Sequence, residues 1–191
     1  MTADPSPSEP YSLTVDVDIQ DPAWTEAVPS AVALAEEVIR ETLANKAVWC
    51  HWPEAAPTGA LEVSVCFAGN EFVQGLNQKF RGKNTATNVL SFPAGDRPGN
   101  RIGTEPVMLG DIVLAQGVVL AEARRDGKTP RAHTSHLLIH GALHLLGFSH
   151  NLDPEAEAME ALEVEILEVL GIANPYLETS GQKQTPKRQT Q

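Results

Sequence analysis

Cysteine, long apolar runs and positive charge are all scarce in this chain of 191 residues. The two cysteines, Cys50 and Cys66, exclude a disulfide-based scaffold and a zinc site made of cysteines alone. No run of eighteen apolar residues exists, so the sequence predicts no segment that spans a membrane. The net charge of −11 argues against a general nucleic-acid coat, although it leaves room for one local basic groove.

The two ends of the chain differ in composition from the part between them. The first residues lack the basic and apolar regions of a secretory signal, so we expect a cytoplasmic protein. Residues 1–10 contain three prolines and predict a flexible lead, and the polar residues 177–191 predict a flexible tail. Hydrophobic residues make up 42% of the chain, enough for residues 11–176 to fold as one domain.

The period of the hydrophobic pattern changes several times along the expected domain. Apolar and polar residues alternate, or short apolar runs occur, in four segments that predict strands: residues 13–19, 61–67, 89–92 and 107–114. Helical periods predict five helices: residues 24–44, with Pro29 as a candidate first turn, 70–80, with Asn70 as N-cap, 116–125, 134–146 and 154–170. Residues 45–59 and 96–104 predict loops. This order indicates an α+β fold, a single domain with a roughly four-stranded mixed sheet and about five helices.

Five of the six histidines lie between His133 and His150. His140 and His144 are four residues apart on a predicted helix, so they share one face of it. Gly147 can end that helix in the left-handed conformation, which lets the chain turn back and bring His150 beside them. Three imidazoles leave zinc an open fourth position, as in catalytic sites. The spacing therefore predicts one Zn²⁺ per chain on this helix and its following turn, although histidines also accept nickel, copper or cobalt.

The remaining histidines allow other interpretations. His136 is also four residues before His140, so spacing alone could pair those two instead. We expect His136 and His133 to support the site or the fold, and His51 to lie in a loop rather than to bind metal. The spacing resembles the metzincin protease motif H-E-x-x-H-x-x-G-x-x-H. Gly141 replaces the glutamate base of that motif, which argues against a zinc peptidase.

A basic segment precedes the third predicted strand. Lys79, Arg81 and Lys83 gather at the end of a predicted helix, where cations are favoured for structural reasons as well. From residue 79 to residue 131 there are nine lysines and arginines against five acidic residues, so the middle of this acidic protein is locally positive. Because the planar fork of arginine fits phosphate, the segment suggests a phosphodiester substrate.

The last predicted helix carries seven carboxylates and no basic residue between residues 153 and 168. Most of these carboxylates are expected to form a solvated helix face. Glu160 and Glu163 are three residues apart, and one of them could orient a histidine ligand from behind.

Three ordered blocks of this sequence resemble the YbeY family of metal-dependent endoribonucleases, also called rRNA maturation factors. The stretch HGALHLLGFSH at His140–His150 is similar to the family pattern H-G-x-L-H-L-x-G-[YF]-D-H. Asn77–Pro93 is similar to N-x-x-[YF]-R-x-x-D-x-x-T-[DN]-V-L-S-F-P, and Leu109–Leu114 to L-G-D-I-x-[IL]. The resemblance extends over about Tyr11–Gly171, with the order and spacing of the blocks intact.

The resemblance implies roles for individual residues. It implies that His140, His144 and His150 bind zinc and that Arg81 is functionally important. We expect Arg81 to bind phosphate and to stabilise the transition state. The implied activity is cutting of single-stranded RNA, in maturation of the 3′ end of small-subunit 16S rRNA and in ribosome quality control. The implied partners are rRNA, the small ribosomal subunit and assembly factors, with neither DNA nor a membrane expected.

Two departures from the family pattern bear on the mechanism. Asn84 and Ser149 stand where the family has aspartate, and both can still hydrogen-bond in a positioning role. Ser149 is thus a candidate supporting residue, and Lys79, Lys83, Asn84 and Asn88 are candidate RNA contacts. The general base and the nucleophile stay open. A ribosome-assembly factor whose metal is mainly structural, and which binds RNA or a partner protein without cutting, remains an alternative.

Overall fold

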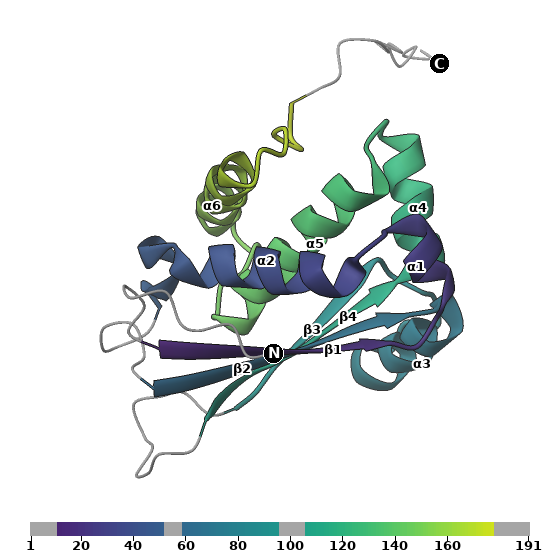
Figure 1. Ribbon diagram of the computed structural model, residues 1–191, viewed down its shortest axis with the longest axis horizontal. Helices are drawn as coiled ribbons and strands as arrows, with labels where there is room; N and C mark the ends of the chain where they lie inside the picture. Colours follow the sequence, from purple (N-terminus) through teal and green to yellow (C-terminus); the bar gives the residue numbers. More distant parts are fainter. Residues whose placement is uncertain (1–10, 52–58, 96–105, 178–191) are drawn as a thin grey trace, which may run out of the picture.

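The computed structural model describes residues 11–51, 59–95 and 106–177. Within them, four strands form one mixed sheet in the order β1-β2-β4-β3 (Figure 1). Its strands are β1 (Tyr11–Ile19), β2 (Gly59–Ala68), β3 (Val89–Pro93) and β4 (Val107–Ala115). β1, β2 and β4 are parallel, whereas the edge strand β3 is antiparallel to β4. The predicted α+β fold with a four-stranded mixed sheet is confirmed, while the predicted lead, the 96–104 loop and nearly all of the tail lie outside the described residues.

Helices cover both faces of the sheet, but unequally. α2 (Ala31–Ala44) and α5 (Pro130–Leu145) lie across one face, and α3 (Asn70–Arg81) lies against the other (Figure 1). The larger core, which includes Leu61, Phe67 and Ile112, belongs to the α2 and α5 side. A smaller cluster around Val73 and Val113 lies under α3. Within the described residues, much of the α3 side of the sheet therefore has no helix packed on it.

The helix predicted over residues 24–44 is divided in two. α1 (Ala23–Ala27) and α2 are separated by Pro29 and by Ser30, whose φ of 62° is left-handed. Proline lacks the amide hydrogen and disfavours a helical conformation in the residue before it, so the first helix ends there. Pro29 therefore precedes α2 instead of forming its first turn. The described chain consequently has six α-helices where the sequence predicted about five.

Two further local predictions were wrong. The predicted loop after α2 contains a 3₁₀-helix, η1 (Lys46–Trp49), because Val48 and Trp49 are buried in the core and Trp49 Nε1 donates to the carbonyl of Leu43 at 3.0 Å. Asn70 does not cap α3; it is the first residue of that helix, after Gly69. Its side-chain oxygen accepts instead from the amide of Val118, in the first turn of α4 (Gln116–Arg125), at 3.2 Å.

α5 is the central helix, in contact with α2, α4, β3, β4 and α6 (Asp153–Val169). It begins four residues before the predicted start, because the Thr129 side chain accepts from the amide of Ala132 at 3.1 Å and Pro130 occupies the first turn. None of the helices within residues 11–51, 59–95 and 106–177 combines the length and the hydropathy needed to cross a membrane.

Gly141 sets how closely α5 approaches the sheet. A Cβ atom at this position would lie 2.9 Å from Ile112 Cγ2 and 3.1 Å from Ser91 Oγ. Both neighbours are themselves buried, in β4 and β3. The helix backbone therefore rests almost directly on these two strands.

We expect Gly141→Ala to lower the free energy of unfolding by about 1–3 kcal/mol, the usual cost of overpacking. Gly75→Ala is the matched control, because Gly75 lies within α3 and its added Cβ would meet no atom within 4 Å. Alanine should there raise stability by about 0.5–1 kcal/mol. Urea unfolding of both variants measures the difference, and an equal effect of the two would contradict the close approach.

Candidate metal centre

His140, His144 and His150 meet at the C-terminal end of α5. One nitrogen from each ring lies within 4.8 Å of the other two, and the ring centroids are 4.5, 5.0 and 5.5 Å apart. His140 and His144 are partly buried, whereas His150 is exposed. Among the described residues, this is the group of histidine, cysteine or carboxylate side chains whose geometry could hold a metal ion.

The turn after α5 brings His150 back to the helix. Gly147 has a φ of 95°, its amide donates to the carbonyl of His144 at 3.1 Å, and the amide of Phe148 donates to that of Leu143 at 3.0 Å. These two bonds form a Schellman motif, with glycine in the left-handed position. The ring of Phe148 is buried in the core, which anchors the turn. The helix end predicted from Gly147 is therefore present in the structure.

The hydrogen bonds of the rings show that this donor set fits a cation. His140 Nδ1 faces a carboxylate oxygen of Glu163 at 2.7 Å, and His144 Nδ1 faces the carbonyl of Phe148 at 2.9 Å. Both partners only accept, so both Nδ1 atoms carry the proton. In the neutral rings the two Nε2 atoms then present lone pairs to each other, 3.0 Å apart. Zinc–nitrogen bonds of about 2.0–2.1 Å would place two tetrahedral ligands about 3.3 Å apart, close to this separation.

The surroundings of His144 keep its ring neutral. Burial is the main cause that lowers its pKa, to about 4, and the neighbouring His140, His150 and Arg81 act in the same direction against the hydrogen bond to Phe148. A neutral imidazole is the form that binds a metal. The charge of Arg81, at the end of α3, thus acts on the His144 ring.

Glu163 is the carboxylate behind the cluster, and its side chain is only 1% exposed. Its Oε1 accepts from His140, and its Oε2 contacts His136 Nε2 at 2.9 Å and the hydroxyl of Tyr176. Burial raises the pKa of Glu163, but the three hydrogen bonds outweigh burial and lower the pKa to about 2. The ionised carboxylate thus fixes the tautomer and the orientation of His140. Glu160, the other candidate of the sequence analysis, is exposed.

Tyr176 was not predicted from the sequence. It follows α6, and besides Glu163 it contacts His136, with 3.2 Å between its hydroxyl and Nε2 and 5.5 Å between the ring centroids. Burial and the neighbouring Glu163 carboxylate raise its pKa, so the hydroxyl stays protonated and donates. No local pattern marks this tyrosine, because its partners belong to other helices.

The position of the protease base is closed to any side chain. Gly141 faces Ile112 and Ser91 on the sheet, so a longer side chain there would collide with the core. The chemistry of a glutamate-assisted zinc peptidase is therefore not favoured by this site.

The residues around Arg81 differ in their surroundings. Lys79, Arg81 and Lys83 are exposed at the C-terminal end of α3, which closes at Gly82 with a φ of 69°. Asn84 is exposed, and its side-chain and backbone oxygens accept from Gln74 Nε2 at 3.0 and 3.2 Å. Lys79, Arg81 and Lys83 form a basic rim at the end of α3, and the charge of Arg81 acts on His144. The contact of these residues and of Asn84 with RNA stays a prediction.

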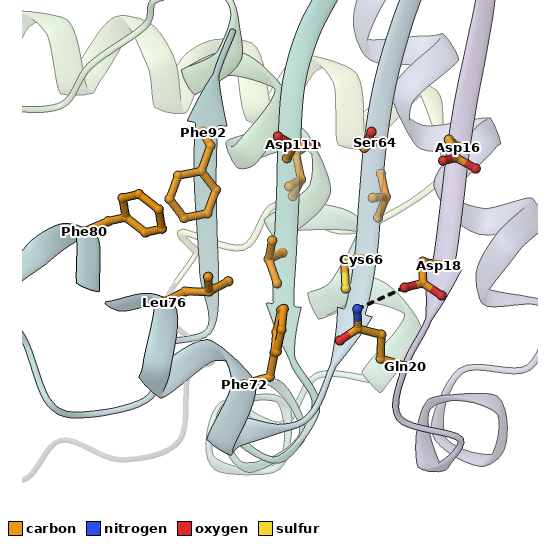
Figure 2. A pocket seen from close by; sticks show the side chains of 13 residues that line it. Asp16, Asp18, Gln20, Ser64, Cys66, Phe72, Leu76, Phe80, Phe92 and Asp111 are labelled. Carbon is orange, nitrogen blue, oxygen red and sulfur yellow. Dashed lines mark hydrogen bonds between the residues drawn. The ribbon is translucent and has the colours of Figure 1, made fainter. Parts of the chain in front are cut away.

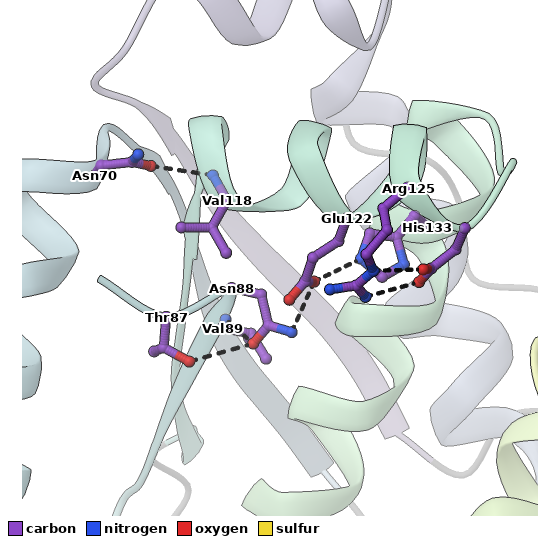
Figure 3. A network of polar contacts seen from close by, with 9 residues as sticks. Asn70, Thr87, Asn88, Val89, Val118, Glu122, Arg125 and His133 are labelled. Atoms are coloured by element: carbon purple, nitrogen blue, oxygen red, sulfur yellow. Dashed lines mark hydrogen bonds and ion pairs between the residues drawn. The ribbon is translucent and has the colours of Figure 1, made fainter. Parts of the chain in front are cut away.

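Asn88 belongs to a polar network between elements (Figure 3). Its amide donates to Glu122 Oε2 at 3.0 Å, and the same oxygen contacts His133 Nε2 at 2.8 Å. Its own Oδ1 accepts from the amide of Val89 at 2.7 Å. Burial lowers the pKa of His133, against the hydrogen bond with Glu122. The network fixes the start of β3 to α4 and α5, which gives Asn88 a structural role in addition to its predicted contact with RNA.

Ser149 and His51 lie beside the turn that carries His150. Ser149 Oγ donates to Glu155 Oε2 at 2.5 Å, so this serine brings a carboxylate to the position next to His150. His51 is exposed, and its ring contacts that of Phe148 with centroids 4.6 Å apart. It is not part of the three-histidine cluster.

Comparison with known proteins identifies the family. The sequence profile described as Endoribonuclease YbeY matches residues 24–171. The chain belongs to the YbeY endoribonuclease family. Proteins named Endoribonuclease YbeY from Paramagnetospirillum magneticum and Azorhizobium caulinodans are 43% and 41% identical to it, each over 86% of this chain and 96% of the relative. The one from Dinoroseobacter shibae is 39% identical over 92% of this chain and 97% of the relative. As a YbeY protein, the chain is an RNA-cleaving hydrolase, a metallo-endoribonuclease of rRNA processing, and the resemblance seen in the sequence is confirmed.

We expect Glu163→Gln to weaken metal binding by about 10- to 100-fold, because a neutral amide no longer holds His140 Nδ1–H in place. Competition with a chromogenic chelator measures this affinity directly. Glu160→Gln is the matched control on the same helix and should leave the affinity unchanged. Equal losses in both variants would mean that general negative charge, and not the carboxylate behind His140, supports the site.

Proposed function

We propose that this chain is a zinc-dependent endoribonuclease that cuts single-stranded RNA during maturation of the 3′ end of 16S rRNA, with one Zn²⁺ held by His140, His144 and His150. The observation that carries the proposal is the convergence of these rings, with Glu163 and Phe148 presetting two of them. A bound divalent ion supplies Lewis acidity and lowers the pKa of water toward about 7. The chain's own residues bind, orient and polarise the RNA around it.

Arg81 has the chemistry and the position to bind phosphate. Its guanidinium is always charged and can donate two parallel hydrogen bonds to phosphate oxygens. It is exposed, and it lies close enough to His144 for its charge to act on that ring. Arg81 therefore binds the scissile phosphate, or the one next to it, and stabilises the negative charge that develops during cleavage.

The exposure of the site favours a strand that can bend into it. His150 and Arg81 both face solvent, while His140 and His144 are partly buried below them. Single-stranded RNA can present one phosphate to such a shallow site, because its backbone is not held in a duplex. In the cell, the small ribosomal subunit and assembly factors in the cytoplasm would deliver this strand, and residues 11–176 would form the catalytic domain.

Arg81→Ala should lower kcat/KM on a labelled single-stranded RNA by about 100- to 1000-fold, the usual loss when one donor to a developing negative charge is removed. Metal content should stay that of the wild type, because Arg81 is not a ligand. Arg124→Ala, an exposed arginine on α4, is the matched control and should cut at the wild-type rate.

His144→Ala, purified in the same way, should lose both the metal and the cleavage. Removal of metal with a chelator should abolish cutting by the wild type, and added Zn²⁺ should restore it. Cleavage that survives in the His144→Ala preparation would come from a contaminating nuclease, and wild-type protein that binds metal but cuts nothing would refute the proposal.

A further inference from the structure

An exposed phenylalanine, Phe80, lies next to Arg81 in the chain and pairs with the partly buried Phe92. Phe80 is 57% exposed, and its ring meets that of Phe92 with centroids 5.1 Å apart and planes at 65°. Figure 2 shows the two rings side by side at the β3 edge of the sheet. Lys79 Nζ lies 5.0 Å from the centroid of the Phe80 ring. A large exposed aromatic side chain beside cationic groups suits a ligand that has a flat face and a negative charge.

The pair lies across the edge strand from the histidines. Ser91 of β3 faces α5 at Gly141, next to His140. Phe92 follows Ser91 and therefore points to the opposite face of the sheet, where it meets Phe80. β3 is the last strand of the sheet in the described part of the chain, so no further strand separates the two faces at this edge. A nucleic-acid strand that leaves the metal centre past Arg81 reaches Phe80 next.

The charges on this side of the sheet restrict where such a strand can run. Phe80 and Phe92 line a hollow of about 470 Å³ whose other walls include Asp16, Asp18 and Asp111. The first two lie on β1, away from the aromatic pair (Figure 2), and Asp111 lies opposite Phe92 in the β3–β4 pairing. These carboxylates repel a phosphate backbone from the floor of the hollow. The backbone is therefore confined to the basic rim, from which an uncharged base can reach the ring.

We propose that Phe80, supported by Phe92, is a stacking subsite for one unpaired base of the RNA near the scissile phosphate. The inference rests on the proposed function and adds to it a reason for the preference for single strands. Only an unpaired base exposes a face that can lie on an aromatic ring. Stacking of this kind is tolerant of base identity, because every base has such a face. The subsite thus distinguishes unpaired from paired RNA but does not distinguish one base sequence from another.

The test compares two phenylalanines of the same helix. Phe80→Leu should raise KM for a short single-stranded RNA on the order of 10-fold while kcat stays near the wild-type value, because stacking holds the substrate without touching the reacting phosphate. Phe80→Trp should keep the wild-type KM. Phe72→Leu is the control: Phe72 is 46% exposed on α3 and lines the same hollow, but it lies eight residues before Phe80. Eight helical residues span about 12 Å, beyond the reach of a base stacked on Phe80, so this replacement should leave KM unchanged.

A scan of abasic substrates identifies the contact itself. Removal of the base at one position should raise KM of the wild type as much as Phe80→Leu raises it on intact RNA. In the Phe80→Leu variant, removal of the same base should raise KM no further. The stacking subsite is refuted if Phe80→Leu keeps the wild-type KM. It is also refuted if this substitution raises KM by the same factor whichever base is missing, because Phe80 then contacts no particular base. If the metal-loaded wild type does not cut RNA at all, the proposed function fails instead. The same variants and RNAs then test the base contact by fluorescence anisotropy of binding.

Discussion

The site depends on how closely α5 rests on the sheet. Gly141 is in contact with Ile112 and Ser91 through its backbone alone, so the helix has no freedom to move inward and would lose its packing by moving outward. His140 immediately precedes Gly141 on the helix, and His144 follows it by three residues, about one turn. Their height above the sheet is therefore set by a glycine that touches neither the metal nor the RNA. The same contact holds β3 against α5. Because Phe92 of β3 meets Phe80 of α3, it also helps to fix the position of the end of α3 relative to the histidines.

A second constraint comes from burying one negative charge. A carboxylate as enclosed as that of Glu163 is stable only when donors satisfy it. The donors come from two turns of α5 and from the chain beyond α6, so a single group connects three segments. Tyr176 lies after residue 171, where the match to the family profile ends. Part of the support for the metal centre thus comes from a segment that the profile does not include.

The predictable features of this protein are those governed by local geometry. The spacing of His140 and His144 follows from the period of a helix, and Gly147 specifies its own turn. Alternating residues located β1 and β2, and short apolar runs located β3 and β4, for the same reason. Local pattern could not choose between Glu160 and Glu163, because they share one side of α6 and only its rotation against α5 decides which is buried. Asn70 was misassigned because its partner amide belongs to a helix far along the chain, and Tyr176 was missed on similar grounds.

The turn after α5 holds the three histidines of the candidate metal centre in unequal ways. His140 and His144 stand on a helix packed on both sides, whereas His150 follows a turn closed by two backbone hydrogen bonds and by the ring of His144 itself. Opening this turn moves His150 without disturbing the helix, but it also frees His144 Nδ1 from its partner. If these histidines hold a metal ion, His150 would be the one that can withdraw while His140 and His144 stay on α5. Such a withdrawal would depend on local opening of residues 146–150 rather than on the stability of the whole domain.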